Sequence, residues 1–366
     1  MSYKVPQLIP YVGKDELDNL KQVIDKKWIT EGPFSQEFLK LIKEKTGAKY
    51  AVLANNGTLA LFLALKALGI KEGDEIIVPD FTFIASATSI YFTGAKPVFV
   101  DVNKETLNID VTKIESLITP NTKAIMPVHV YGQAADMAPI IAIAEKYNLK
   151  IIEDAAQGYG VYYKGKHTGT IGDVGTISFF ADKTVTMGEG AVVLTNDEEI
   201  YNTLRLLRNQ GRPNSGTFIH PALGMNFRIT DMQCAVGVAQ LKKFEEINRI
   251  KQENFNLYHE LLKGVKEISF VKVQEYTNFV PFRVNILTER KAELMEYLED
   301  KGIQTRSFFY PLHRQPCFAY LDYKEVNFPN SNYLYDKGLS LPIFPDLTRG
   351  QIELVCNTII NFYSKK

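Results

Sequence analysis

Two apolar runs enclose one lysine in Gly172-Asp-Val-Gly-Thr-Ile-Ser178-Phe-Phe-Ala-Asp-Lys183-Thr-Val-Thr-Met-Gly188-Glu-Gly-Ala191-Val-Val-Leu194. The runs are rich in β-favouring residues, which predicts a strand ending near Phe180 and another beginning at Ala191. Lys183 would then lie in a tight loop at the carboxyl end of buried strands. Desolvation there lowers the pKa of an amine and suits it to Schiff-base chemistry. The alternative is a solvated lysine in a surface turn. An isolated lysine in the sequence does not distinguish a reactive lysine from a solvated one.

Strands and helices alternate on the amino-terminal side of this stretch. Short apolar runs predict strands at 50–54, 75–79, 97–100, 124–128 and 150–153, with helices at 59–68, up to 92, and at 137–147. This alternation predicts an α/β fold with a mostly parallel sheet covered by helices on both faces. Helical spacing also predicts helices at 14–27 and 35–45, ahead of the first strand.

The pattern changes after residue 197. It predicts helices up to 207, at 232–244 and on to 263, and the polar, glycine-rich segment 209–224 is long enough to indicate a functional or interface loop. From 268 onward it is α+β, with strands near 268–273, 280–287 and 303–309 and helices near 290–301 and 348–363. We therefore expect a large domain at 1–245 and a small one at 246–366.

Composition gives no electrostatic reason to expect nucleic acid or an anionic membrane as a partner. Lysine plus arginine and aspartate plus glutamate are balanced at 42 each. No run approaches the ~18 apolar residues of a membrane span, and the first residues do not resemble a signal peptide, so we expect a cytoplasmic protein. Cys234, Cys317 and Cys356 are widely spaced in apolar surroundings, which favours core thiols over disulfides or a metal site.

Polar clusters follow the predicted strands, and ligands of parallel sheets bind at that edge. The clusters are Gly57-Thr58, Phe81–Phe83, His129–Gly132, Asp154–Gln157 and Ser178–Lys183. Gly57-Thr58 begins a helix, so it is either an anion site or an ordinary helix start capped by Asn56 or Thr58. Asp154 is either a helix N-cap or the partner of a cation, because a buried carboxylate is costly without one.

Taken together, these motifs resemble the DegT/DnrJ/EryC1/StrS family of sugar aminotransferases over nearly the whole chain. The resemblance is carried by Asn56–Leu61, Glu75–Pro79, Pro127–Gly132, Glu153–Gln157, Ser178–Lys183, Thr186–Gly190, Gly224–Arg228 and Phe309–His313. It implies pyridoxal 5'-phosphate (PLP) as cofactor and the aspartate-aminotransferase type of fold, PLP fold type I.

The resemblance also implies a role for each matching residue. Lys183 would carry PLP as a Schiff base, Asp154 would face the ring nitrogen, and Gln157 would contact the ring hydroxyl. Gly57, Thr58 and Ser178 would hold the phosphate, and Phe83 would stack on the ring. Asn226 would reach the phosphate from the neighbouring subunit of a homodimer with composite active sites. The matching residues indicate no metal.

Within the family, the post-lysine loop and Arg306-Ser-Phe-Phe-Tyr-Pro-Leu-His313 are most similar to the GDP-perosamine synthases. Those enzymes move the amino group of L-glutamate to C4 of GDP-4-keto-6-deoxymannose. Arg306 and His313 are candidate substrate contacts, although His313 also suits a structural hydrogen bond. Lys183 argues against the related 3-dehydratases, which carry histidine there.

Three other functions stay open. One is a C4 or C3 aminotransferase for a UDP- or dTDP-linked keto sugar. Another is a non-catalytic regulator of the same fold that binds nucleotide sugars. A nicotinamide-dependent oxidoreductase would share the alternation, but no G-x-G-x-x-G run follows a strand.

Overall fold

A seven-stranded sheet forms the centre of the protein in the computed structural model, which describes residues 3–214 and 216–364. Strand β9 runs antiparallel to both of its neighbours, and the other strands run in one direction. In spatial order the strands are β1 (Tyr50–Ala54), β9 (Ala191–Thr195), β8 (Val174–Ser178), β5 (Lys150–Asp154), β4 (Thr122–Ile125), β2 (Glu75–Pro79) and β3 (Lys96–Val100). The predicted mostly parallel sheet is confirmed.

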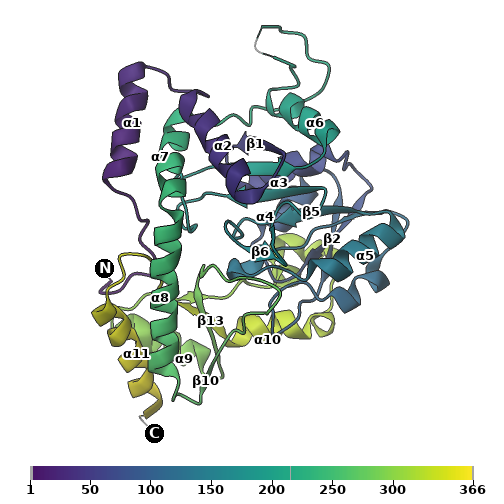
Figure 1. Cartoon of the computed structure of the whole chain (residues 1–366). Coiled ribbons are helices and arrows are strands. Elements are labelled where there is room, and N and C mark those ends of the chain that lie inside the picture. Colours follow the sequence, from purple (N-terminus) through teal and green to yellow (C-terminus); the bar gives the residue numbers. More distant parts are fainter. Residues whose placement is uncertain (1–2, 215, 365–366) are drawn as a thin grey trace.

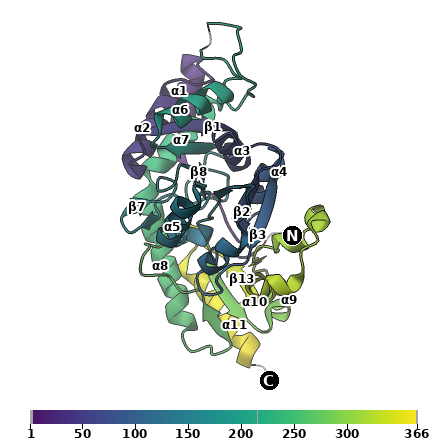
Figure 2. The ribbon, with the colours of Figure 1, turned by 90° about the vertical axis from the view of Figure 1, so that its right-hand side faces the viewer.

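Helices cover both faces of this sheet (Figures 1 and 2). Neighbouring strand residues such as Val52 and Leu53 belong to different apolar clusters, because successive side chains of a strand point to opposite faces. One face packs against α3 (Gly57–Ala67), α4 (Ala85–Tyr91) and α6 (Glu198–Arg208). The other packs against α2 (Pro33–Thr46), α5 (Met137–Tyr147) and α7 (Asp231–Lys242), and α1 (Lys14–Lys26) lies against α7. The strands are therefore shielded on both sides, which explains why their sequences are mainly apolar and do not alternate between apolar and polar residues.

The long helix α8 (Phe244–Leu262) leads from the large sheet to a four-stranded antiparallel sheet (Figure 1). That sheet has the order β10 (Ile268–Phe270), β11 (Val284–Thr288), β13 (Gly338–Leu341) and β12 (Arg306–Ser307), with helices α9 (Lys291–Asp300), α10 (Pro329–Lys337) and α11 (Arg349–Ser364). Val5 is fully buried in the apolar cluster of this region and pairs with Ile303. The amino-terminal segment thus packs on the carboxyl-terminal part, and a domain boundary near 245 stays a prediction.

Sequence and structure differ most in short elements. The sequence pattern missed α10, β13 and the hairpin of β6 (Tyr162–Tyr163) and β7 (Lys166–His167). Strand β13 has only four residues, too few for a reliable period-2 pattern. Strand β4 ends at Ile125, before the predicted end at 128, and Pro127 has no N–H to donate to a neighbouring strand.

Two further expectations concern burial and membranes. Cys234 and Cys356 are buried as predicted, but the prediction is wrong for Cys317, which is exposed. Cys317 lies in the 3-10 turn Pro316–Leu321, where only Phe318 is buried. In the described part of the chain, no helix is both long and apolar enough to cross a membrane.

Candidate active site

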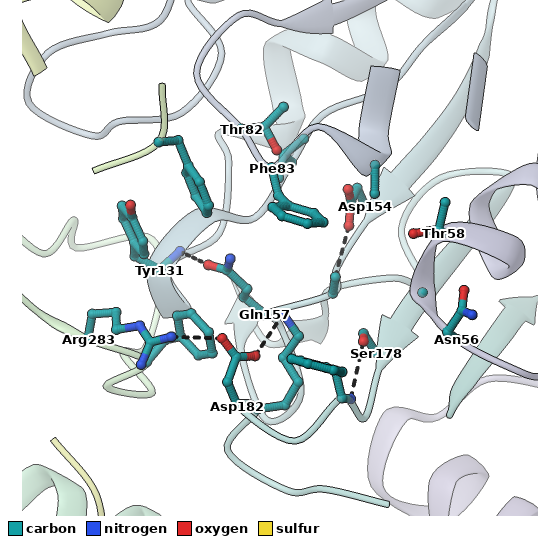
Figure 3. A pocket seen from close by; sticks show the side chains of 18 of the residues that line it. Asn56, Thr58, Thr82, Phe83, Tyr131, Asp154, Gln157, Ser178, Asp182 and Arg283 are labelled. Carbon is teal, nitrogen blue, oxygen red and sulfur yellow. Dashed lines mark hydrogen bonds and ion pairs between the residues drawn. The ribbon is translucent and has the colours of Figure 1, made fainter. Parts of the chain in front are cut away.

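A cavity of about 880 Å³ opens where the parallel strands end (Figure 3). Residues after β1, β2, β5 and β8 form one wall, and the segments before β11 and around β12 form the opposite wall. The lining includes Gly57, Thr58, Phe83, Asp154, Gln157, Ser178, Asp182, Lys183, Phe282, Arg283, Arg306 and Phe309. The fold therefore gathers most of the predicted site residues, although they are up to 250 positions apart in the sequence.

The start of α3 forms one end of the cavity. Asn56 caps this helix, because its Oδ1 accepts a hydrogen bond of 3.0 Å from Leu59 N. Gly57 and Thr58 lie in the first turn, where backbone N–H groups have no acceptor inside the helix. The structure thus confirms the cap and also leaves these N–H groups facing the cavity, at the end of the helix dipole that attracts anions.

Asp154 ends β5 and is only 4% exposed. Ser86 Oγ donates to its Oδ2 at 2.6 Å, and Ala156 N donates to its Oδ1 at 3.1 Å. The bond to Ala156 is a local turn contact, and no helix begins between residues 155 and 161, so the helix N-cap alternative for Asp154 is wrong. Burial lowers the pKa of Lys183, and the negative charge of Asp154 across the cavity opposes that shift. Asp154 is therefore a buried carboxylate directed at the same space as Lys183.

Lys183 follows β8 in a loop that folds back on the strand. Lys183 N donates to Phe180 O at 2.9 Å, and Met187 N donates to Phe179 O at 2.8 Å. The Nζ lies 3.6 Å from Asp182 Oδ1 and 5.1 Å from the centre of the Phe282 ring. Burial lowers the pKa of Lys183, while Asp182 opposes that shift. A larger fraction of this amine is neutral than for a solvated lysine, as nucleophilic attack or proton abstraction requires.

Gln157 and Phe83 border the centre of the cavity. Gln157 Oε1 accepts a hydrogen bond of 2.6 Å from Tyr131 N, which fixes the side-chain amide. Phe83 is 58% exposed although it is a large apolar side chain. Figure 3 shows its ring over the cavity, between Tyr131 and Asp154. An exposed aromatic ring in this place is available to stack on a planar ligand.

The sequence model of the DegT/DnrJ/EryC1/StrS aminotransferase family matches this chain over residues 10–360. The chain belongs to this family. Aminotransferases of the DegT/DnrJ/EryC1/StrS family depend on PLP, and this protein is therefore a PLP-dependent aminotransferase.

Several relatives match nearly the whole chain. The GDP-perosamine synthase of Escherichia coli O157:H7 is 39% identical, with 99% of each chain covered. The GDP-perosamine synthase of Caulobacter vibrioides is also 39% identical, with 94% of this chain and 95% of the relative covered. Among solved structures, S. venezuelae DesV in complex with a ketimine intermediate has a TM-score of 0.91 at 33% identity, covering 96% of this chain and 95% of DesV.

The cavity of this DegT/DnrJ/EryC1/StrS aminotransferase fits PLP. A Cβ added to Gly57 would lie only 3.1 Å from Ser178 Cβ and 3.2 Å from Ser178 Oγ. The space between the helix start and Ser178 therefore depends on glycine, and it presents N–H and O–H donors of the kind that bind a phosphate. An amine of lowered pKa and a buried carboxylate, the other two groups that PLP needs, line the same cavity.

Three predicted residues lie apart from the centre. Arg306 lines the cavity, with its Nη1 at 3.6 Å from Asp182 Oδ2. Asn226 is exposed, its Oδ1 accepts from Arg228 N, and it does not line the cavity of its own chain. His313 is buried behind the wall, with its Nδ1 at 2.8 Å from Asp80 Oδ2. That position favours the structural hydrogen bond over contact with substrate.

Sequence reasoning missed Arg283, Asp182 and Tyr131. Arg283 interrupts the apolar run Phe279-Val-Pro-Phe-Arg283-Val-Asn-Ile286, which predicts a buried strand, and a cation in such a run signals a special environment. Asp182 adjoins Lys183 in the sequence, and no local pattern distinguishes it from an ordinary loop carboxylate. Tyr131 lies in the predicted cluster 129–132, but its φ of 54° in a tight turn was not foreseen.

Proposed function

We propose that this protein moves the amino group of L-glutamate to C4 of a nucleotide-linked 4-keto-6-deoxy sugar, converting GDP-4-keto-6-deoxymannose to GDP-perosamine. The observation that carries the proposal is the full-length similarity to two GDP-perosamine synthases, together with a half-buried lysine of lowered pKa in the cavity. The cavity volume of about 880 Å³ is large enough for a cofactor with a small sugar ring.

Gly57, Thr58 and Ser178 would hold the cofactor phosphate through backbone N–H groups and the Ser178 hydroxyl. The side-chain amide of Gln157 would donate to the ring hydroxyl, because its oxygen is already engaged with Tyr131 N. Phe83 would cover one face of the ring. The buried carboxylate of Asp154 would keep the ring nitrogen protonated, since a charge of opposite sign favours the protonated form.

When bound, PLP supplies an electron sink that acidifies the proton on the carbon bearing the amine. Lys183 Nζ would remove that proton from the α-carbon of glutamate and deliver it to the cofactor carbon on the other side of the substrate nitrogen, as general base and then general acid. Its lowered pKa suits this exchange at neutral pH. On a keto sugar the same lysine would move the proton in the opposite direction.

We further propose a homodimer in which Asn226 of the partner subunit reaches the phosphate. The exposure of Asn226 supports this arrangement. So do the apolar side chains of the preceding loop, where Phe218 is 87%, Ile219 76% and Leu223 100% exposed. Exposed apolar groups clustered in one loop are typical of a protein interface.

Absorbance spectroscopy tests the proposed function. The purified protein should carry PLP, and adding glutamate should shift its absorbance to that of the pyridoxamine form. A panel of GDP-, UDP- and dTDP-4-keto-6-deoxy sugars, read by product mass, would then identify the acceptor. Turnover by Lys183→Ala would refute the role of Lys183, and amination of only UDP- or dTDP-linked sugars would refute the assignment of GDP.

A further inference from the structure

Arg283 has an unused hydrogen-bond donor in the wall of the cavity. Its side chain is 4% exposed, and Nη2 donates to Asp182 Oδ2 at 2.8 Å. Its other terminal nitrogen, Nη1, is buried and has no hydrogen-bond partner among the described residues. A buried charged donor without an acceptor costs at least ~1–3 kcal/mol, so a missing ligand is a better explanation than chance.

The short distance between Arg283 and the Lys183 amine restricts the kind of ligand that Arg283 can bind. The Asp182 carboxylate alone spans the gap, with Oδ1 3.6 Å from Lys183 Nζ and Oδ2 2.8 Å from Arg283 Nη2. The same Phe282 ring lies 5.1 Å from Lys183 Nζ and 4.5 Å from Arg283 Cζ. Figure 3 shows the carboxylate of Asp182 facing the guanidinium of Arg283. An anion at Arg283 would therefore lie about one carboxylate width from the amine.

The charges around Asp182 leave room for a second anion. Asp182 is within ion-pair distance of three cations, Lys183, Arg283 and Arg306. Lys251 lies behind them, buried, with its Nζ at 3.4 Å from Thr184 Oγ1, and burial lowers its pKa to about 7, so it carries only part of a positive charge at neutral pH. Asp154, on the opposite side, is occupied by Ser86 and Ala156. Glu189 also lines the cavity but is exposed to solvent, where its charge is screened.

We propose that Arg283, assisted by Arg306, binds the α-carboxylate of the amino donor. The donor's amine must take the place of the Lys183 amine, and its α-carboxylate is only two bonds from that amine. The planar guanidinium keeps one nitrogen on Asp182 and offers the other to the substrate. The diphosphate of a nucleotide sugar is separated from C4 by the sugar ring, so it lies too far from the amine to be this anion.

This inference rests on the proposed function. Two amides of glutamate test the role of Arg283 separately from that function. Glutamine lacks the distal carboxylate, and isoglutamine lacks the α-carboxylate. In absorbance titrations of the half-reaction, Arg283→Gln should weaken the reaction with glutamate and with glutamine by roughly 30-fold or more, as expected for loss of a buried charge-assisted contact. The reaction with isoglutamine, weak from the start, should not change further.

Two variants and a binding measurement serve as controls. Arg290→Gln removes an exposed arginine paired with Glu293 and should leave all three donors unaffected. Arg283→Lys keeps the charge but not the planar fork, so it should lose less than Arg283→Gln, and it replaces that variant if the glutamine protein does not fold. Calorimetry with glutarate, which has carboxylates but no amine, should show binding weakened by roughly 10-fold or more in Arg283→Gln.

Each of the following results would overturn either the role of Arg283 or the proposed function. Equal losses with all three donors would mean that Arg283 only supports the structure. A loss with glutamate but not glutamine would assign the distal carboxylate instead. An effect confined to the KM of the nucleotide sugar would assign the diphosphate. If the wild-type protein does not react with glutamate, the proposed function fails; if it reacts and Arg283→Gln matches it, only the role of Arg283 fails.

Discussion

Replacing Gly57 by alanine tests how closely the phosphate site depends on one missing side chain. The new Cβ would lie 3.1 Å from Ser178 Cβ and 3.2 Å from Ser178 Oγ, so Ser178 must shift by a few tenths of an ångström. Ser178 ends the fully buried strand β8, which leaves its backbone little freedom to move. The hydroxyl would therefore turn away from the space between strand and helix.

Two effects on stability oppose each other in this variant. Overpacking costs ~1–3 kcal/mol, while alanine in place of glycine favours a helix by up to ~1 kcal/mol. The free energy of unfolding of the apoprotein should thus fall by no more than about 3 kcal/mol. Loss of one hydrogen bond to a charged phosphate costs a further ~1.5–3 kcal/mol of binding, so the Kd for PLP should rise roughly 10- to 100-fold.

Absorbance or fluorescence titration of the apoprotein with PLP measures this Kd. Pyridoxal, which has no phosphate, should bind the wild type and Gly57→Ala about equally. Gly350→Ala is a matched control, because Gly350 also lies in the first turn of a helix, α11, and an added Cβ meets nothing within 4 Å. Unchanged PLP affinity in Gly57→Ala, or an equal loss in Gly350→Ala, would refute the reasoning.

Three more predictions concern buried polar groups. Asp154→Asn keeps the shape but removes the charge, so the single-turnover rate with glutamate should fall roughly 100-fold while PLP stays bound; an unchanged rate would exclude an electrostatic role. His313→Ala removes the ring contact to Asp80 Oδ2 but keeps the hydrogen bond from the backbone N of residue 313 to Asp80 Oδ1, so denaturant unfolding should show a loss of ~1–3 kcal/mol with little change in kcat; a large rise in the KM of the sugar would instead support substrate contact. Burial lowers the pKa of His167 from 6.5 to about 4, and its Nε2 accepts from Gly160 N at 2.9 Å. The unfolded chain therefore binds the proton more tightly, and stability should fall by up to about 3 kcal/mol as pH drops from 6.5 to 4; His167→Gln should flatten that part of the pH profile.

The sequence by itself determined the large sheet and the identity of most groups in the cavity. The strands at 50–54 and 75–79 and the helix at 137–147 were predicted with their observed bounds, because short apolar runs that alternate with helical patterns and are separated by polar turns admit few other structures. Since parallel strands end at one edge, the order of motifs along the chain was enough to place Gly57, Asp154, Ser178 and Lys183 together.

The tertiary structure decided what the opposite wall contributes. Arg283 is 101 positions from Asp182 in the sequence, and only the packing of the small sheet against the large one makes them an ion pair. The same packing buries His313 on Asp80, away from the cavity, although its motif suggested substrate contact. Local patterns encode strands, turns and residue types, whereas burial and pairing across two separate sheets depend on contacts that no local pattern records.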